Sequence, residues 1–308
     1  MNVLGIIRSA LRIAGHLAVW VGLYSAGAAV CFAHIAGRQV SLSVLWIAGT
    51  TAMGVYLFDR VKLSDGMLDP ADRQAHPERF TFLSGRTRPA RALAIVLGLA
   101  AMVVAAGVHP LAIAMVPCAF LGVFAYAGLP RNRRRGQFDF GRARGPRVKD
   151  ILLVKNVAVA VCMTVFVGLL VVLSGSSDGD WRGVWQTWQA DGPNIAVAGV
   201  FLFGLILADA ILCDIDDGPA DAAHGTSTLP ERFGVSAAWL VAGMLYVGIG
   251  LLVLVEAGGE PLAHARRTWA LLTMASVVVL YLCRPKRLRD LIDLRLPVVA
   301  VIAAAMIG

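Results

Sequence analysis

The chain of 308 residues is 58% hydrophobic and only 16% charged, and its mean hydropathy is +0.71. This composition excludes an ordinary soluble domain of this length. The formal net charge of +8 is interpreted as a membrane-topology signal and not as a nucleic-acid surface. Apolar runs of membrane-spanning length recur and the short alternating strands of a membrane barrel are missing, so we expect an all-α polytopic membrane protein with a single domain over residues 1–308.

The first apolar run follows two arginines. Arg8 and Arg12 precede the hydrophobic stretch within Met1–Gly37, and the run is long and lacks a small-x-small cleavage site, which indicates an uncleaved signal anchor. Further apolar runs follow, so that we expect about nine transmembrane helices around a central cavity. The predicted spans are residues 14–35, 41–59, 90–108, 110–128, 151–173, 194–213, 235–256, 267–283 and 294–308.

The loops between these spans differ in their content of basic residues. A cytoplasmic N-terminus places most of the 28 Lys and Arg residues on the cytoplasmic side, as the positive-inside rule requires. Two loops that are rich in acids, at residues 59–85 and 209–234, then face the cytoplasm. In a bacterium the membrane would be the cytoplasmic membrane. The arginine cluster at 131–135 is interpreted as a contact with membrane lipids, not with nucleic acid. The cytoplasmic segments are residues 1–13, 60–89, 129–150, 214–234 and 284–293.

The loop after the second span is rich in both acids and bases. Such a mixture suits a phosphate-bearing substrate, because carboxylates hold a metal ion while Arg and Lys neutralise the remaining phosphate charge. Three of the acids have the i, i+4, i+7 spacing of one helix face, although Pro70 interrupts it. A salt-bridged surface helix is the alternative. The acids are Asp59, Asp65, Asp69, Asp72 and Glu78, and the bases are Arg60, Lys62, Arg73, Arg79 and Arg86.

Two ionisable residues fall inside predicted spans. Lys155 lies about one turn into the fifth span, and Asp209 lies about one turn before the end of the sixth. Intramembrane charges usually face a cavity or one another; the alternative for Lys155 is an amine that extends to the membrane interface. Residues 174–193, between these spans, carry three tryptophans spaced i, i+4, i+7, which predicts a short interfacial helix.

Three acids define the loop after the sixth span. Asp214, Asp217 and Asp221 have i, i+3, i+7 spacing, so that one helix face would carry three mutually repelling carboxylates. A Mg²⁺ ion relieves this repulsion, since it prefers carboxylate oxygens together with substrate phosphate oxygens. We expect the helix to end near Asp217 and Pro219 to open a new turn, with the acids across a helix junction. A solvated acidic loop is the alternative.

The two acidic loops occupy equivalent places in the chain. Each follows a pair of spans and four spans separate them, so both face the same side. The halves, about 1–128 and 129–308, are interpreted as a pseudo-repeat that presents its acids to one cavity. The reaction class indicated is departure of a diphosphate from an allylic carbon, with metal and basic groups stabilising the leaving group and apolar helices excluding water.

The second loop closely resembles the signature of the UbiA-type intramembrane prenyltransferases. In that signature N-D-x-x-D-x-x-x-D is followed by a Gly, a Thr-Leu pair, and an Arg and a Gly before the next helix. The first loop matches in two incomplete registers, with either Asp59-Arg60 or Asp72-Arg73 as the Asp-Arg pair of the family. The second-loop matches are Asp214, Asp217, Asp221, Gly225, Thr228-Leu229, Arg232 and Gly234, with Cys213 in place of the leading Asn.

This resemblance implies Mg²⁺-dependent transfer of a prenyl group from a polyprenyl diphosphate to a lipophilic acceptor, such as an aromatic ring or a quinone precursor. The implied catalytic residues are Asp214, Asp217, Asp221 and Asp59. The implied diphosphate-binding residues are Arg60, Arg73 and Lys155. The implied metal ligands are Asp214, Asp217, Asp221, Asp65, Asp69 and Asp72.

Two other functions stay open. A membrane transporter explains Lys155 and Asp209, but it does not explain two acidic loops with metal-ligand spacing on one face. A catalytically inactive relative that acts as a binding subunit is compatible with the incomplete first loop. The sequence selects neither the acceptor nor the chain length of the donor.

Overall fold

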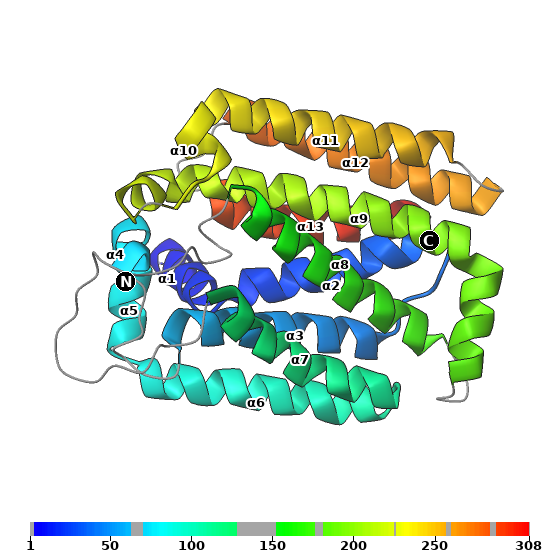
Figure 1. Cartoon of the computed structure of the whole chain (residues 1–308), viewed down its shortest axis with the longest axis horizontal. Coiled ribbons are helices and arrows are strands. Elements are labelled where there is room, and N and C mark those ends of the chain that lie inside the picture. Colours follow the sequence, from blue (N-terminus) through cyan, green and yellow to red (C-terminus); the bar gives the residue numbers. More distant parts are fainter. Residues whose placement is uncertain are drawn as a thin grey trace.

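The computed structural model describes residues 3–62, 70–127, 152–175, 181–224, 226–256, 260–283 and 288–307 (Figure 1). Within these ranges the chain is helical and contains no strand, which confirms the predicted all-α fold. The helices are α1 (Val3–His16), α2 (Val19–Ile35), α3 (Leu42–Val61), α4 (Pro70–Ala75), α5 (Pro77–Ser84), α6 (Thr87–Ala106), α7 (Pro110–Ala127), α8 (Val154–Ser174), α9 (Trp181–His224), α10 (Leu229–Phe233), α11 (Val235–Val255), α12 (Glu260–Cys283) and α13 (Leu288–Ile307).

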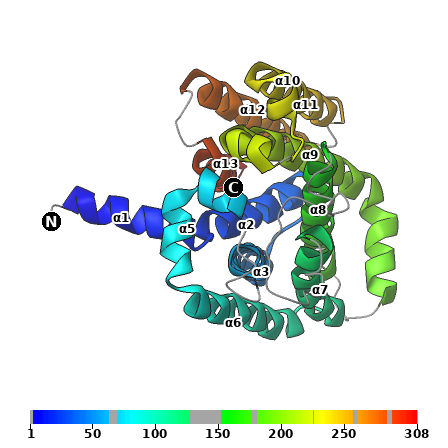
Figure 2. The same ribbon diagram turned by 60° about the vertical axis from the view of Figure 1, so that its left-hand side comes forward.

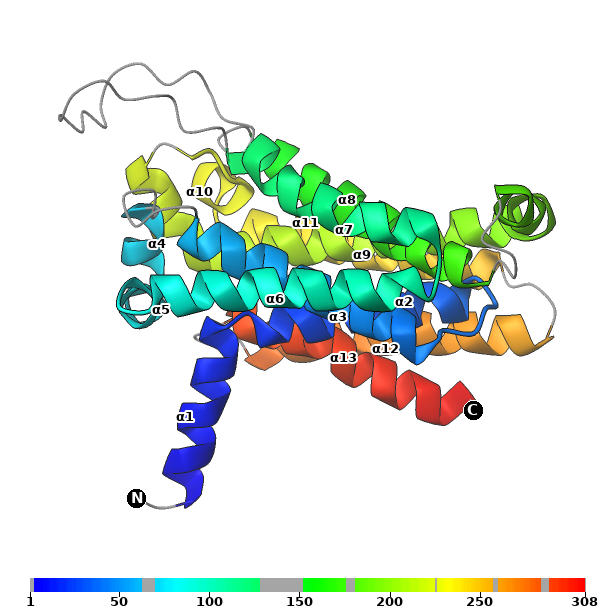
Figure 3. The same ribbon diagram turned by 90° about the horizontal axis from the view of Figure 1, so that it is seen from below.

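The long helices lie side by side in one bundle (Figures 1 and 3). Its main core cluster runs from α2 to α13 and includes the buried side chains of Phe32, Phe201 and Trp269. Helix α3 packs between α2 and α6 (Figure 2). The short helices α4, α5 and α10 gather at one end of the bundle, and α1 leaves the bundle at that same end (Figures 1 and 3). This end also carries the second acidic loop, with Asp214, Asp217 and Asp221, and we call it the acidic end. The first and second acidic loops are called the first and second acidic segments below.

The bundle is that of an integral multi-pass membrane protein. In the described ranges six helices are long and apolar enough to cross a membrane, or seven if the bent pair α1 and α2 forms one span. Each of the nine predicted intervals overlaps a long helix, but the count of nine spans is not confirmed. The part of α7 whose side chains are described, Pro110–Gly122, is apolar but short, and α13 begins with four charged residues among its first eight, which makes it a poor hydrocarbon-spanning segment.

Helix α9 corrects two of the sequence-based expectations. It runs for 44 residues through Pro193 and Pro219, so the tryptophan segment and the sixth span form one element and the acids do not lie across a helix junction. A proline removes one backbone hydrogen bond and bends a helix, and Figure 1 shows the Trp181 end of α9 turning aside. Beyond Pro219, Asp221 lies 3.6 Å from Lys155 of α8, and this contact holds the last turns of α9 in place.

Helices α2 and α3 approach each other closely at two glycines. A Cβ atom added at Gly22 would lie 2.8 Å from the backbone carbonyl oxygen of Gly49, and one added at Gly49 would lie 3.2 Å from the carbonyl oxygen of Gly22. Small residues at helix contacts are a main source of stability in membranes, because lipid tails remove the hydrophobic advantage of large side chains.

We therefore expect Gly22→Ala to lower the free energy of unfolding by about 1–3 kcal/mol, because the new methyl group meets backbone that cannot rotate away. The control is Gly243→Ala on α11, where an added Cβ meets no atom within 4 Å and the better helix propensity of alanine applies. Thermal unfolding in detergent measures both. Equal midpoints for the two variants would show that α2 and α3 are not in close contact.

Candidate active site

The three predicted acids of α9 lie on one helix, and a lysine from α8 joins two of them. The Nζ atom of Lys155 lies 2.7 Å from Oδ1 of Asp214 and 3.6 Å from Oδ2 of Asp221. The side chain of Asn156 donates a 3.0 Å hydrogen bond to the other oxygen of Asp214. Asp214 and Asn156 are buried. The amine of Lys155 thus faces the acids of α9.

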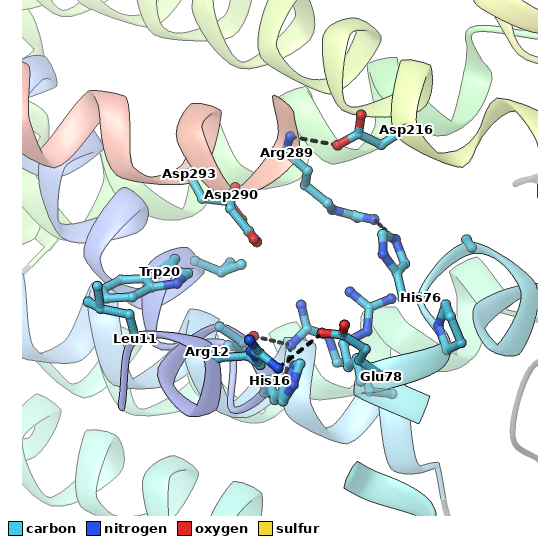
Figure 4. Close-up of a pocket in the computed structure, with 17 residues that line it drawn as sticks. Leu11, Arg12, His16, Trp20, His76, Glu78, Asp216, Arg289, Asp290 and Asp293 are labelled. Carbon is cyan, nitrogen blue, oxygen red and sulfur yellow. Dashed lines mark hydrogen bonds and ion pairs between the residues drawn. The ribbon is translucent and has the colours of Figure 1, made fainter. Parts of the chain in front are cut away.

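Asp217 receives its partners from two other parts of the chain. Nε2 of His76, between α4 and α5, lies 2.8 Å from one oxygen of Asp217. The guanidinium of Arg289 on α13 donates a 2.9 Å hydrogen bond to the other oxygen, and the backbone N–H of Arg289 donates at 2.9 Å to Asp216 (Figure 4). Asp217 therefore ties α9 to α13 and to the start of α5.

Sequence reasoning did not single out Arg289. It lies in the basic segment 284–293, whose arginines served only as a topology signal. The topology prediction places Arg289 on the same side of the membrane as Asp217. This predicted proximity was the only feature of the sequence that could have suggested a contact between them. His76 was likewise visible only as a histidine inside the first acidic loop.

Two of the predicted first-loop residues, Asp59 and Arg60, have partners outside α9. Asp59 forms an ion pair with Lys62. Arg60 donates hydrogen bonds of 3.0 Å to the carbonyl oxygens of Gly15 and His16. Among the remaining predicted residues, Arg73 is exposed on α4, the side chain of Asp72 lies outside the described structure, and Asp65 and Asp69 fall in the gap 63–69.

A cavity of about 310 Å³ lies at the acidic end and borders both acidic segments. His76, Glu78 and Arg79 line it from the first segment, and Asp216 lines it from the second (Figure 4). Asp216 lies on a different face of α9 from the three acids predicted to bind metal. Since His76 lines the cavity and also contacts Asp217, it connects the cavity to those three acids.

The carboxylates of α9 fit Mg²⁺ by the type of their donor atoms, because this ion prefers carboxylate oxygens. The buried Oδ2 atom of Asp221 has no hydrogen-bond partner, and its ion pair with Lys155 is long, at 3.6 Å. Asp214 and Asp217 already contact cationic side chains of the chain itself. In the described ranges no three His, Cys, Asp or Glu side chains are gathered around one point at which a metal ion would fit.

Two solved membrane-protein structures are similar to this chain. The chain is similar in fold to the apo structure of a UbiA homolog from Aeropyrum pernix K1, with a TM-score of 0.61, 13% sequence identity, and coverage of 93% of this chain and 98% of that chain. A structure reported for digeranylgeranylglyceryl phosphate synthase in membranes aligns with a TM-score of 0.49 and 13% identity over 95% of this chain and 97% of that chain. No curated protein matches the sequence.

The family assignment rests on the sequence match, which extends over most of the bundle. The model of the UbiA prenyltransferase family matches residues 70–293, from the start of α4 into α13. This range includes Lys155, Asp214, Asp217, Asp221 and Arg289, and it confirms the resemblance seen in the second acidic loop. The protein belongs to the UbiA prenyltransferase family.

Proposed function

We propose that the protein transfers a prenyl group from a polyprenyl diphosphate to a lipophilic acceptor within the membrane, with Mg²⁺ bound at the acidic end of the bundle on the cytoplasmic side. Members of the family are prenyltransferases, and the fold supports intramembrane prenyl transfer in general. For this chain the observation that carries the proposal is Lys155, held between Asp214 and Asp221 at one end of an apolar bundle. Such a place suits a phosphate headgroup whose hydrocarbon tail lies among apolar helices.

The cations beside the carboxylates have a defined role in this proposal. Lys155 and Arg289 bind oxygens of the diphosphate and stabilise the charge that develops on the leaving group. Before substrate binds, the same two cations hold Asp214 and Asp217, so that the acids do not repel one another. Substrate phosphates then replace carboxylates as partners of cations that are already in position, which limits the cost of reorganisation.

The acids of the two segments supply the metal ligands in this proposal. Asp214, Asp217 and Asp221 would hold Mg²⁺, and the buried Oδ2 atom of Asp221, which accepts no hydrogen bond, supports this role. When bound, the ion would neutralise diphosphate charge as the bond to the allylic carbon breaks. From the first segment we propose Asp65, Asp69 and Asp72 as further ligands, Asp59 as a catalytic residue, and Arg60 and Arg73 as diphosphate contacts.

Diphosphate release by the reconstituted protein tests the proposal. Prenyl diphosphates of several chain lengths are offered with and without Mg²⁺ to the wild type, to Asp217→Asn and to Asp191→Asn. We expect Mg²⁺-dependent release that falls by about 10²-fold or more in Asp217→Asn, because a transition-state charge contact is lost. Asp191 pairs with Arg38 at 3.2 Å at the other end of α9, so Asp191→Asn is expected to keep the activity of the wild type.

A missing acceptor would also give no turnover, so binding is measured separately. Mg²⁺-dependent binding of a non-cleavable prenyl diphosphate analogue is expected for the wild type and is expected to weaken in Asp217→Asn. Absence of both turnover and binding would refute the transferase proposal.

One observation favours an inactive relative as the second candidate. Asp59 and Arg60, which match one register of the first family motif, contact Lys62 and the end of α1. A binding subunit would bind the analogue and release no diphosphate with any acceptor class offered. This combination of results separates the two candidates.

A further inference from the structure

Helix α1 has an apolar side that no described part of the protein covers. The exposed fractions of Ile6, Ile7, Leu11 and Ile13 are 42–51%. Ser9, Arg12 and His16 recur at i, i+3 and i+7 on another side of the helix, and Ile7 lies farthest from them. Such segregation of apolar and polar residues is typical of helices that lie in the plane of a membrane interface.

The direction of α1 is fixed by defined contacts. The axes of α1 and α2 differ by 72°, and Ala18 at the junction has a left-handed backbone with φ 61°. The guanidinium of Arg60 donates hydrogen bonds to the last carbonyl groups of α1, those of Gly15 and His16, where a cation also interacts favourably with the helix dipole. Figures 2 and 3 show α1 pointing away from the bundle.

This direction lies near the plane of the bilayer. Transmembrane helices tilt by about 20° on average, so a helix bent by 72° from α2 runs closer to the membrane plane than to its normal. Helix α2 has 17 residues, which lies within the range of about 17–25 that crosses the hydrocarbon core. Helix α1 is therefore not required for the crossing.

The polar side of α1 faces the short helix α5. Arg12 lies 3.7 Å from Glu78, and the rings of His16 and Phe82 stack at 5.2 Å between centroids. Because α5 belongs to the acidic end of the bundle, outside the long apolar helices (Figure 3), the opposite, apolar side of α1 is directed toward the hydrocarbon region.

We propose that α1 lies flat in the headgroup region of the leaflet at the acidic end, with Ile6 and Ile7 in the acyl boundary and Ser9 facing water. The occupant of the apolar side is thus lipid, with phosphate headgroups near Arg12. Helix α1 also supplies Leu11, Arg12, Gly15 and His16 to the wall of the cavity. One wall of that cavity is then positioned by the membrane surface and not by the bundle alone.

Site-directed spin labelling of the full chain tests this proposal. Single cysteines replace Ile6, Ile7 and Ser9 in a background without the exposed Cys118, Cys162 and Cys283, and the protein is reconstituted into vesicles of phosphatidylcholine and phosphatidylglycerol. Collision rates with oxygen, which enters lipid, and with a nickel chelate, which stays in water, are measured for each label. Val247 on α11 and Glu231 on α10, both exposed, provide the lipid and water references.

We expect the ratio of oxygen to nickel collisions at Ile6 and Ile7 to be several-fold higher than at Ser9, and the ratio at Ser9 to match the Glu231 reference. Three water-like ratios would place α1 in solution and overturn the proposal. Three lipid-like ratios would show that α1 is immersed in hydrocarbon, which would also overturn it. Protection from both reagents at Ile6 and Ile7 would show that protein, such as a second copy of the chain, covers the apolar side in place of lipid. Each labelled protein is first shown to elute as the wild type does, so that misfolding is excluded.

Discussion

Replacing Asp209 by asparagine is expected to lower the free energy of unfolding by about 3–5 kcal/mol, because it leaves a buried guanidinium without its counter-charge. The Nη2 atom of Arg295 donates to both oxygens of Asp209, at 2.6 and 2.7 Å. The hydroxyl of Tyr24 donates to Asp209 at 2.7 Å, and Tyr246 donates to its other oxygen. These four side chains join α2, α9, α11 and α13, and Asp209 and Arg295 are almost completely buried.

A matched control and a double variant make this expectation specific. Asp191→Asn removes the same charge from the same helix, but its partner Arg38 lies at 3.2 Å and Asp191 is partly exposed, so a loss of at most about 1 kcal/mol is expected. Adding Arg295→Met to Asp209→Asn is expected to restore part of the stability, since no unpaired charge then remains in the core. Thermal unfolding is followed by labelling of the buried Cys31 thiol. Equal losses for Asp209→Asn and Asp191→Asn would contradict the ion pair.

Lys155→Gln is expected to lower the rate of diphosphate release by about 10²-fold or more, as removal of a charge-stabilising group at a developing anion does. This expectation rests on the proposed transferase activity. In the free protein the substitution also leaves Asp214 and Asp221 without the ammonium group that joins them. Turnover of a prenyl diphosphate by the reconstituted protein measures the effect, and thermal unfolding shows whether the variant is folded.

Lys155→Arg distinguishes charge from shape at this position. It keeps the positive charge but changes its hydration and hydrogen-bond geometry, so the turnover is expected to fall between those of the wild type and Lys155→Gln. A folded Lys155→Gln variant with wild-type turnover would show that Lys155 only neutralises the two carboxylates.

The sequence predicted most of the helices because hydropathy reports burial in lipid directly. Every predicted apolar interval overlaps a long helix, and the acids of α9 were placed on one face by spacing alone. The end of α9 was predicted wrongly because proline is a local signal, whereas the contact that keeps Asp221 in place comes from Lys155 on another helix. Local propensity cannot report such a tertiary contact.

The partners of the charged residues were the least predictable part of the site. Asp209 was recognised as an intramembrane charge, but its partner Arg295 lies 86 residues further along the chain, and hydropathy does not identify which arginine faces which acid. For Arg60 the family register suggested a phosphate contact, whereas its hydrogen bonds to Gly15 and His16 depend on the direction of α1. Roles of this kind follow from how helices are oriented and not from spacing along one helix.

Helix α13 is joined to α9 at two levels, and this double attachment limits how the acidic end can move. Arg289 binds Asp217 and, six residues deeper, Arg295 binds Asp209, so the two attachments lie about 9 Å apart along α13. Two such points resist both rotation of α13 about its axis and sliding along α9, since either motion would separate paired charges, and the pair of Arg295 and Asp209 is buried where little water can replace it. We therefore expect α9 and α13 to move as one unit, and a change in the width of the cavity to come from the other helices that line it, α1, α2, α3, α4 and α5.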